Sequence, residues 1–267
     1  FTFKKGLGQN FLTARNILEE IVDAAEIESG VIEVGPGFGV LTSELAQNSD
    51  KVVTIEIDER LIDVLDYTLA EYDNVKIINE DILKLDLKKV IDDEFNGEKV
   101  SIAANLPYYI TTPIITKLLE EKLPIKNIVV MVQKEVAERM SAKPSTKDYG
   151  AITVLCQYYT EPSIVANVPA SLFVPPPKVD SAVLKLKVLD KPSVEVKDEG
   201  VFFRVVKAAF SQRRKTLLNC LSANFPIPKD EISTLLESIG IAPSRRGETL
   251  SLKEFANIAD TLLQKIK

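Results

Sequence analysis

Short apolar runs alternate with segments of helical spacing along the first half of the chain. The runs lie at residues 31–34, 52–57, 75–78, 100–104 and 128–132. Runs of this length are typical of buried strands, whereas the apolar positions between Thr13 and about Ile27 recur with the spacing of an amphipathic helix. Five strands that alternate with helices predict an α/β fold built on a doubly wound, mostly parallel sheet.

The pattern changes near residue 190. Residues 149–159 have helical spacing, and residues 163–168 and 181–188 resemble a closing pair of strands. Beyond Lys191-Pro192 only helical spacing follows, at about 199–224, 229–239 and 251–265. We therefore predict an α/β domain at residues 1–190 and a smaller all-helical domain at residues 191–267.

The chain has no histidine, and this narrows the chemistry. Ser-His-Asp and Cys-His catalysis, His-ligated zinc and the usual general base are all excluded. Cys156 and Cys220 lie far apart in apolar helical contexts, so we expect buried thiols in a reduced, cytoplasmic protein and no metal site. No apolar stretch approaches the roughly 18 residues of a membrane span, so we expect no membrane association.

Acidic residues follow the first three predicted strands or lie within them. Glu33, Glu56 and Asp81 would gather at one edge of the sheet, close to the loop that contains Gly35, Gly37 and Gly39. The glycine spacing departs from G-x-G-x-x-G, because Val40 stands where the third glycine would fall. Three carboxylates would repel a pyrophosphate and attract a sulfonium and an amino group, so S-adenosylmethionine fits better than NAD. The alternative for each acid alone is a helix cap.

The fourth predicted strand ends in Asn105-Leu106-Pro107-Tyr108. Ligands of open α/β sheets collect at the carboxyl ends of the strands. Asn105 offers a side-chain acceptor and two donors, Leu106 a backbone carbonyl and Tyr108 an aromatic face, while Pro107 fixes the backbone. This set would grip a planar base that carries an exocyclic amine. The alternative is an ordinary strand end with a packed tyrosine.

Several motifs together carry a resemblance to a known family. They span nearly the whole chain in order, and the sequence resembles the ribosomal RNA adenine N6-dimethyltransferases, most closely the KsgA-type branch that modifies small-subunit rRNA. The motifs are GQNFL at 8–12, EVGPGFG at 33–39, EID at 56–58, ED at 80–81, NLPY at 105–108, QKEVAER at 133–139, FVPPPKVDS at 173–181 and FSQRRKTL at 210–217. Tyr109 stands where many relatives carry asparagine, which affects the expected shape of the target pocket.

The resemblance implies a Rossmann-like class I methyltransferase domain that uses S-adenosyl-L-methionine. The expected reaction dimethylates the N6 amines of two adjacent adenines in a hairpin loop near the 3′ end of small-subunit rRNA, within an immature 30S-type particle. Asn105 and Leu106 would accept hydrogen bonds from the target amine, Tyr108 would stack on the base, and Phe173 would close its other face or simply pack in the core. The expected cofactor site comprises Asn10, Leu12, Glu33, Gly35, Gly37, Gly39, Glu56, Ile57, Asp81, Ile82 and Asn105.

Basic residues are concentrated in two regions of a chain whose net charge is −6. Residues 1–15 and 201–220 contain Lys and Arg and no acid, which favours phosphate binding over a merely solvated face. The expected RNA-binding residues are Lys4, Lys5, Arg204, Lys207, Arg213, Arg214, Lys215, Arg245 and Arg246. We expect a monomer.

Three other functions are consistent with parts of the pattern. A resistance-type large-subunit (23S) rRNA adenine N6-methyltransferase shares most of the first domain. A non-catalytic ribosome-assembly or transcription factor on the same scaffold would be expected to lose the acids or the Asn105–Tyr108 stretch, which this sequence keeps. A nicotinamide oxidoreductase is disfavoured by the glycine spacing and the acidic strand ends.

Overall fold

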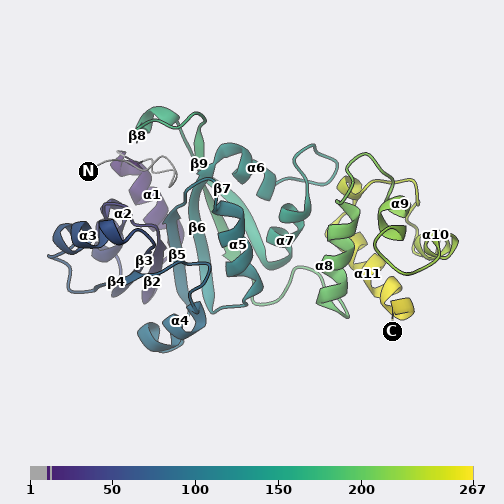
Figure 1. The fold of residues 1–267 in the computed structure, drawn as a ribbon, viewed down its shortest axis with the longest axis horizontal. Coiled ribbons are helices and arrows are strands. Elements are labelled where there is room, and N and C mark those ends of the chain that lie inside the picture. The colour runs from purple at the N-terminus through teal and green to yellow at the C-terminus, as the bar shows by residue number, and fades with distance from the viewer. Residues whose placement is uncertain (1–10, 13, 267) are drawn as a thin grey trace. The chain divides into compact units, whose positions relative to one another are not determined.

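The computed structural model describes residues 11, 12 and 14–266, and it divides into two compact units (Figure 1). The first unit comprises the described residues within Phe1–Ala137 and Glu161–Leu189, and the second comprises those within Glu138–Thr160 and Asp190–Lys267. Residues 138–160 were predicted to belong to the first domain, whereas their contacts place them in the second unit. The division at residue 189 agrees with the change of pattern near residue 190.

The first unit is built on a seven-stranded sheet of order β4-β3-β2-β5-β6-β9-β7. β2 to β6 are parallel and β9 runs antiparallel to β6, so the expected doubly wound, mostly parallel sheet is confirmed. The central strands are buried on both faces, which explains their continuous apolar runs. The strands are β2 (Gly30–Val34), β3 (Lys51–Glu56), β4 (Val75–Asn79), β5 (Val100–Asn105), β6 (Ile125–Gln133), β7 (Thr160–Val168) and β9 (Ser181–Val188).

Helices connect the parallel strands in the order that the sequence predicts. The amphipathic pattern from Thr13 corresponds to α1, whose Ile17, Leu18, Ile21 and Val22 are buried. A separate two-stranded sheet pairs β1 (Phe11–Leu12) with β8 (Phe173–Val174). The other elements of this unit are α1 (Arg15–Ala25), α2 (Val40–Gln47), η2 (Glu59–Leu61), α3 (Ile62–Thr68), α4 (Leu87–Phe95), α5 (Thr111–Glu120) and η3 (Ala170–Leu172). The chain passes into the second unit within α6 (Lys134–Met140).

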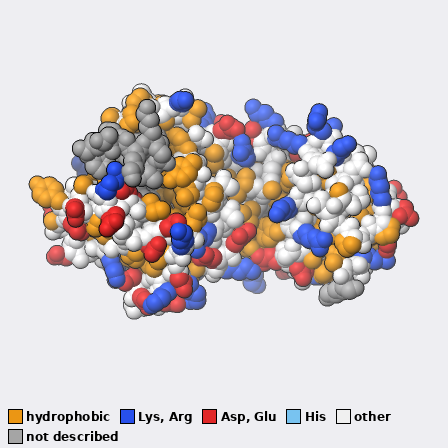
Figure 2. Space-filling model, in the orientation of Figure 1, with side chains coloured by type: hydrophobic (Ala, Val, Ile, Leu, Met, Phe, Trp, Pro, Cys, Tyr) orange, Lys and Arg blue, Asp and Glu red, His pale blue; other side chains and the backbone are white. Residues whose placement is uncertain are grey.

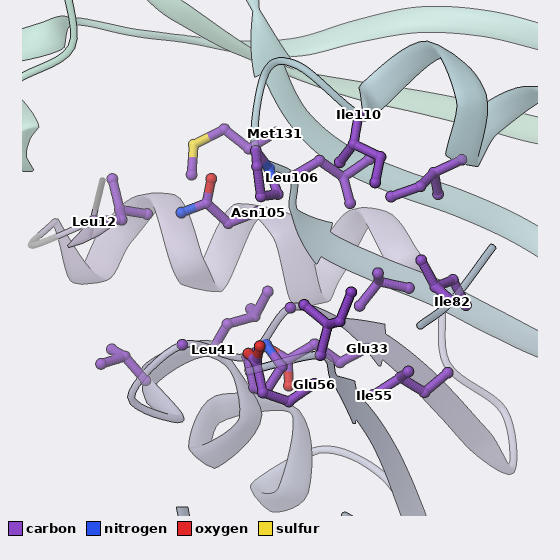
Figure 3. A pocket seen from close by; sticks show the side chains of 18 of the residues that line it. Leu12, Glu33, Leu41, Ile55, Glu56, Ile82, Asn105, Leu106, Ile110 and Met131 are labelled. Atoms are coloured by element: carbon purple, nitrogen blue, oxygen red, sulfur yellow. The ribbon is translucent and has the colours of Figure 1, made fainter. Parts of the chain in front are cut away.

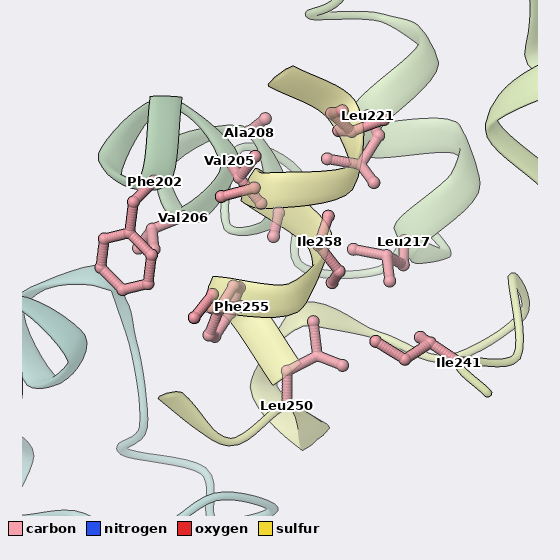
Figure 4. Packing of buried hydrophobic residues seen from close by; sticks show 14 of the residues in the cluster. Phe202, Val205, Val206, Ala208, Leu217, Leu221, Ile241, Leu250, Phe255 and Ile258 are labelled. Carbon is pink, nitrogen blue, oxygen red and sulfur yellow. The ribbon is translucent and has the colours of Figure 1, made fainter. Parts of the chain in front are cut away.

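The second unit is a helical bundle with its own hydrophobic core. Figure 4 shows Phe202, Val206 and Phe255 in one part of this core and Leu217 and Leu221 in another, near Ile258. The Tyr158 ring of α7 stacks on Phe202 of α8 with ring centroids 4.8 Å apart, which is why residues 138–160 belong to this unit. Its elements are α7 (Ala151–Tyr159), α8 (Glu199–Ala209), α9 (Leu217–Ser222), α10 (Lys229–Ser238), η4 (Gly247–Thr249) and α11 (Leu252–Ile266).

The single helix expected at about 199–224 is wrong, because α8 and α9 are separated at residues 210–216. The Leu217 amide at the start of α9 donates to the Arg245 carbonyl at 2.6 Å, and Thr216 caps this helix through the Asn219 amide. Gly247 lies so close to α8 that a Cβ there would fall 2.6 Å from the Ala209 carbonyl oxygen. Tertiary contacts from the 242–249 segment therefore break the helix where the local pattern would continue it.

Candidate active site

A pocket of about 140 Å³ opens at the carboxyl ends of β2, β3, β4 and β5. Figure 3 shows the Asn105 side chain on one side of this pocket and Glu33 and Glu56 on the other. The structure thus brings together the acids and the Asn105–Tyr108 stretch that lie far apart in the sequence. The predicted site residues that line it are Leu12, Glu33, Gly35, Gly37, Glu56, Ile57, Asp81, Ile82, Asn105, Leu106, Pro107 and Tyr108.

The glycine loop between β2 and α2 forms the floor of the pocket. Gly35, Gly37 and Gly39 have φ values of 71°, 61° and 84°, a left-handed conformation that favours glycine. A Cβ on Gly35 would meet no atom within 4 Å, so the backbone there borders open space. The first turn of α2 follows directly at Val40. A ligand therefore has direct access to the loop backbone, as the sequence predicts.

Glu33 is buried at the end of β2 and receives a hydrogen bond from the Thr42 hydroxyl of α2 at 2.5 Å. Burial raises the pKa of this carboxyl to about 7, and the Thr42 bond opposes the rise. Negative charge on Glu56 adds to the rise in the Glu33 pKa. Glu33 bonds to the Thr42 side chain and does not cap the α2 backbone, which was the alternative for this residue. It lines the pocket, and no Lys or Arg is among the other lining residues that the structure describes.

Glu56 and Asp81 line the neighbouring strand ends. Glu56 is buried and accepts a hydrogen bond from the Asp58 amide at 2.8 Å. Burial raises the pKa of Glu56, and the bond from Asp58 opposes this rise. Asp81 accepts from the Leu83 amide at 3.0 Å, so it stabilises a local turn and also faces the pocket. Beside these acids the Ile57 side chain is 55% exposed, and it offers an apolar surface to a ligand.

The Asn105–Tyr108 stretch is held rigidly at the end of β5. The Leu106 amide donates to the Met131 carbonyl at 3.2 Å, and the Ile110 amide donates to the Pro107 carbonyl at 3.1 Å. Tyr108 is half-buried, and its hydroxyl shares a 2.7 Å hydrogen bond with the hydroxyl of Ser181 on β9. Tyr109 is 60% exposed and also lines the pocket.

Two of the expected site residues that the structure describes, Phe173 and Gly39, do not line the pocket. Phe173 is 2% exposed and packs in the core that contains Leu12 and Ile17, so its placement favours the packing alternative. Gly39 lies at the start of α2 beside Leu69 and not among the lining residues. Asn10, together with Lys4 and Lys5, lies outside the described residues.

Two residues outside the pocket lining hold site side chains and were not predicted from the sequence. Thr42 and Ser181 hold Glu33 and Tyr108, respectively, through their hydroxyls. Ser181 ends the FVPPPKVDS motif, which was a signal, but its partner lies 73 positions away along the chain. Only the antiparallel pairing of β9 with β6 brings the two together.

The expected RNA-binding residues of the second unit fall into two groups. The Arg204 guanidinium lies 4.4 Å from the centre of the Phe225 ring, and Arg213 donates to the Lys147 carbonyl. Arg245 pairs with Glu254 and donates to the Thr249 carbonyl at 2.6 Å, so it is a structural residue of the bundle. The group with exposed side chains comprises Arg204, Lys207, Arg213, Arg214, Lys215 and Arg246. Figure 2 shows basic side chains on the visible face of this unit.

The pocket suits a cationic ligand with both polar and apolar parts. Its lining includes Glu33, Glu56, Glu80 and Asp81, and among the described residues that line it there is neither Lys nor Arg. Within the described part of the chain no group of three or more His, Cys, Asp and Glu side chains is placed to hold a metal, and no helix of that part is long and apolar enough to cross a membrane. The residues present therefore fit S-adenosyl-L-methionine, whose sulfonium and amino groups are positive.

The chain is similar to known RNA methyltransferases. The chain is 55% identical over 269 residues to the ribosomal RNA small subunit methyltransferase A of Bacillus mycoides (strain KBAB4), covering 98% of this chain and 92% of that protein. It resembles the crystal structure of a dimethyladenosine transferase from Plasmodium falciparum (TM-score 0.80, 29% identity, 96% and 98% of the two chains). It also resembles the 23S rRNA methyltransferase ErmE (TM-score 0.72, 27% identity, 96% and 100%). The model of the ribosomal RNA adenine dimethylase family matches residues 1–264, and the chain belongs to this family.

Proposed function

We propose that this protein transfers methyl groups from S-adenosyl-L-methionine to the N6 amines of two adjacent adenines in small-subunit rRNA. The observation that carries the proposal is the rigid Asn105–Tyr108 stretch facing an acidic pocket, in a member of the adenine dimethylase family. The 55% identity to a small subunit methyltransferase supports the small subunit as the target. An immature 30S-type particle is the form of the substrate that we propose.

The cofactor supplies a methyl group on a positively charged sulfur. We infer that the acids of the pocket bind this ligand, with Glu56 on the ribose and Asp81 on the adenine. Ile57, whose side chain is 55% exposed, covers an apolar face of the bound adenine. Asn10 completes the proposed site from outside the described residues.

Asn105 and Leu106 act on the target amine. The lone pair of an adenine N6 is delocalised into the ring, so the amine is a poor nucleophile. The Asn105 side-chain oxygen and the Leu106 carbonyl accept hydrogen bonds from its two hydrogens and favour the pyramidal form that attacks. Because the leaving group is a neutral thioether, the reaction needs no strong general base, which agrees with a chain that has no histidine.

Tyr108 holds the base. Its half-buried ring lines the pocket beside Asn105, and stacking of a base on an aromatic ring contributes roughly 1–3 kcal/mol. The exposed residues Arg204, Lys207, Arg213, Arg214, Lys215 and Arg246 bind phosphates of the flanking RNA in this proposal. We assign this RNA-binding role to the second unit and catalysis to the first.

Mapping of radiolabelled methyl groups tests the proposed function. The protein is incubated with labelled cofactor and either small subunits that lack the modification or naked large-subunit rRNA. We expect two adjacent dimethylated adenines in the small-subunit rRNA. Labelling of the large-subunit rRNA alone would favour the second candidate, which the similarity to ErmE supports. Absence of labelling in both would favour the non-catalytic assembly or transcription factor.

Asn105→Ala tests the proposed role of the amide. We expect methyl transfer to fall by a factor of about 100 or more, the scale seen when one preorganised hydrogen-bonding group is removed from an active site. Cofactor binding should stay measurable by calorimetry. Asn48→Ala is the matched control, because Asn48 is exposed at the end of α2 and bonds only locally to the Glu44 carbonyl. Turnover of Asn105→Ala near that of the control would contradict the role.

A ribosomal substrate also supports the expectation of a cytoplasmic protein. The expectation of a monomer stays a prediction. Light scattering of the protein after size-exclusion chromatography would measure the molecular mass in solution, and a mass near 29.6 kDa would agree with a monomer.

A further inference from the structure

The hydroxyl of Tyr108 has a specific partner that base stacking does not explain. Stacking needs only the aromatic ring, so the proposed function leaves the phenolic oxygen without a role. In the structure this oxygen lies 2.7 Å from Ser181 Oγ, in a part-buried hydrogen bond. Burial raises the pKa of the Tyr108 hydroxyl, so the group stays neutral and keeps its proton for hydrogen bonding.

Ser181 is fixed in position by the sheet. It is the first residue of β9, is fully buried, and pairs in register with Gln133 at the end of β6. The Lys134 amide donates to the carbonyl of the preceding residue, Asp180, at 3.0 Å and extends the pairing by one step. A buried hydroxyl that is held this way offers a rigid point of attachment.

Backbone hydrogen bonds also hold the main chain on either side of Tyr108, but they do not fix the orientation of the Tyr108 ring. Backbone bonds fix Leu106 to Met131 and Ile110 to Pro107 on either side of Tyr108. Rotation about χ1 and χ2 of Tyr108 would still move the ring plane. The hydrogen bond to Ser181 ties the far end of the ring to the sheet.

We infer that Ser181 is a positioning residue for methyl transfer, which locks the Tyr108 ring in the plane that receives the target adenine. The inference rests on the proposed function, because it needs a base in the pocket. Ser181 itself does not touch the base. It acts through Tyr108, because its hydrogen bond restricts rotation of the ring before RNA binds. Less rotational freedom is then lost on binding.

Substitution of either partner should weaken turnover by a similar factor. Ser181→Ala and Tyr108→Phe each remove the bond and keep the aromatic ring. We expect kcat/KM for RNA to fall about threefold to tenfold in each variant, the range for one neutral hydrogen bond. Affinity for S-adenosyl-L-methionine, measured by calorimetry, should stay unchanged. Tyr108→Ala should lose far more, because it removes the stacking surface too.

The double variant separates positioning from a general effect on the fold. If Ser181 acts only through the Tyr108 hydroxyl, adding Ser181→Ala to Tyr108→Phe should cause no further loss of kcat/KM. Multiplication of the two losses would overturn the inference. Ser101→Ala is the matched control, because Ser101 is also buried in this sheet and its hydroxyl bonds to the Ala25 carbonyl at 2.6 Å, away from the pocket. It should lower the thermal midpoint and leave kcat/KM unchanged.

The activity of the wild-type protein separates a failure of this inference from a failure of the proposed function. Failure of the wild-type protein to methylate either rRNA would refute the proposed function. Wild-type turnover together with unchanged kcat/KM in Ser181→Ala would refute the positioning role alone. If Ser181→Ala does not fold, Tyr108→Phe and Ser181→Cys supply the test. Tyr108→Phe should then lose about threefold to tenfold, and wild-type activity in that variant would overturn the inference.

Discussion

Replacement of the buried carboxyl at position 33 should remove a pH dependence of stability. Burial raises the pKa of Glu33 from 4.5 to about 7, and each tenfold change in proton affinity is worth roughly 1.4 kcal/mol. The unfolded chain releases this proton near pH 4.5 and the folded protein near pH 7. Wild-type protein therefore loses about 3 kcal/mol of stability, relative to Glu33→Gln, as the pH rises between these values.

Two measurements check this prediction. Urea unfolding of both proteins at several pH values between 5 and 8 should show a difference in the free energy of unfolding that grows with pH and then levels off. In carbon NMR of carboxyl-labelled protein, the Glu resonance that Glu33→Gln removes should titrate near pH 7, and added S-adenosyl-L-methionine should lower that midpoint because a cation favours the ionised acid. A midpoint near 4.5, or a difference in stability that does not change with pH, would refute the reasoning.

Three further predictions concern the second unit. Arg213→Glu combined with Arg214→Glu should weaken RNA binding and flatten its dependence on salt, measured by filter binding at several salt concentrations; an unchanged slope would count against the assignment. Arg245→Ala should lower the free energy of unfolding by about 1–3 kcal/mol, because the guanidinium binds Glu254 and the Thr249 carbonyl. Arg246 is more exposed, so Arg246→Ala should change the free energy of unfolding by less than about 0.5 kcal/mol. Equal effects of the two substitutions in urea unfolding would contradict this difference. Tyr149→Phe should raise the thermal midpoint, since the buried Tyr149 hydroxyl has no hydrogen-bond partner in the described structure; a clear loss of stability would point to an unseen partner.

The position of the site could be predicted because strand ends leave a local signature. The apolar run before Asn105 and the proline after it place this residue at a strand end, and parallel strands bring Glu33, Glu56 and Asp81 to the same edge. The side-chain partners could not be predicted in the same way. The bond between Tyr108 and Ser181 depends on the register of β9 against β6, which residue spacing does not encode.

The errors in the fold have a shared physical cause. The segment at 210–216 contains neither Gly nor Pro, and the break there depends on contacts with the distant residues Arg245 and Gly247. Residues 149–159 have a helical pattern that predicts α7 correctly. That pattern does not show which core receives the apolar face, and Tyr158 packs against Phe202 in the second unit.

The assignment of α7 to the second unit constrains how the protein can be recombined. The chain passes between the units after residues 137, 160 and 189. A chimera made by exchanging only the region beyond residue 190 with a relative would pair a foreign α8 with the native α7, and would leave Tyr158 against unmatched side chains. Transfer of an intact second unit therefore requires both segments, 138–160 and 190–267, to be transplanted together.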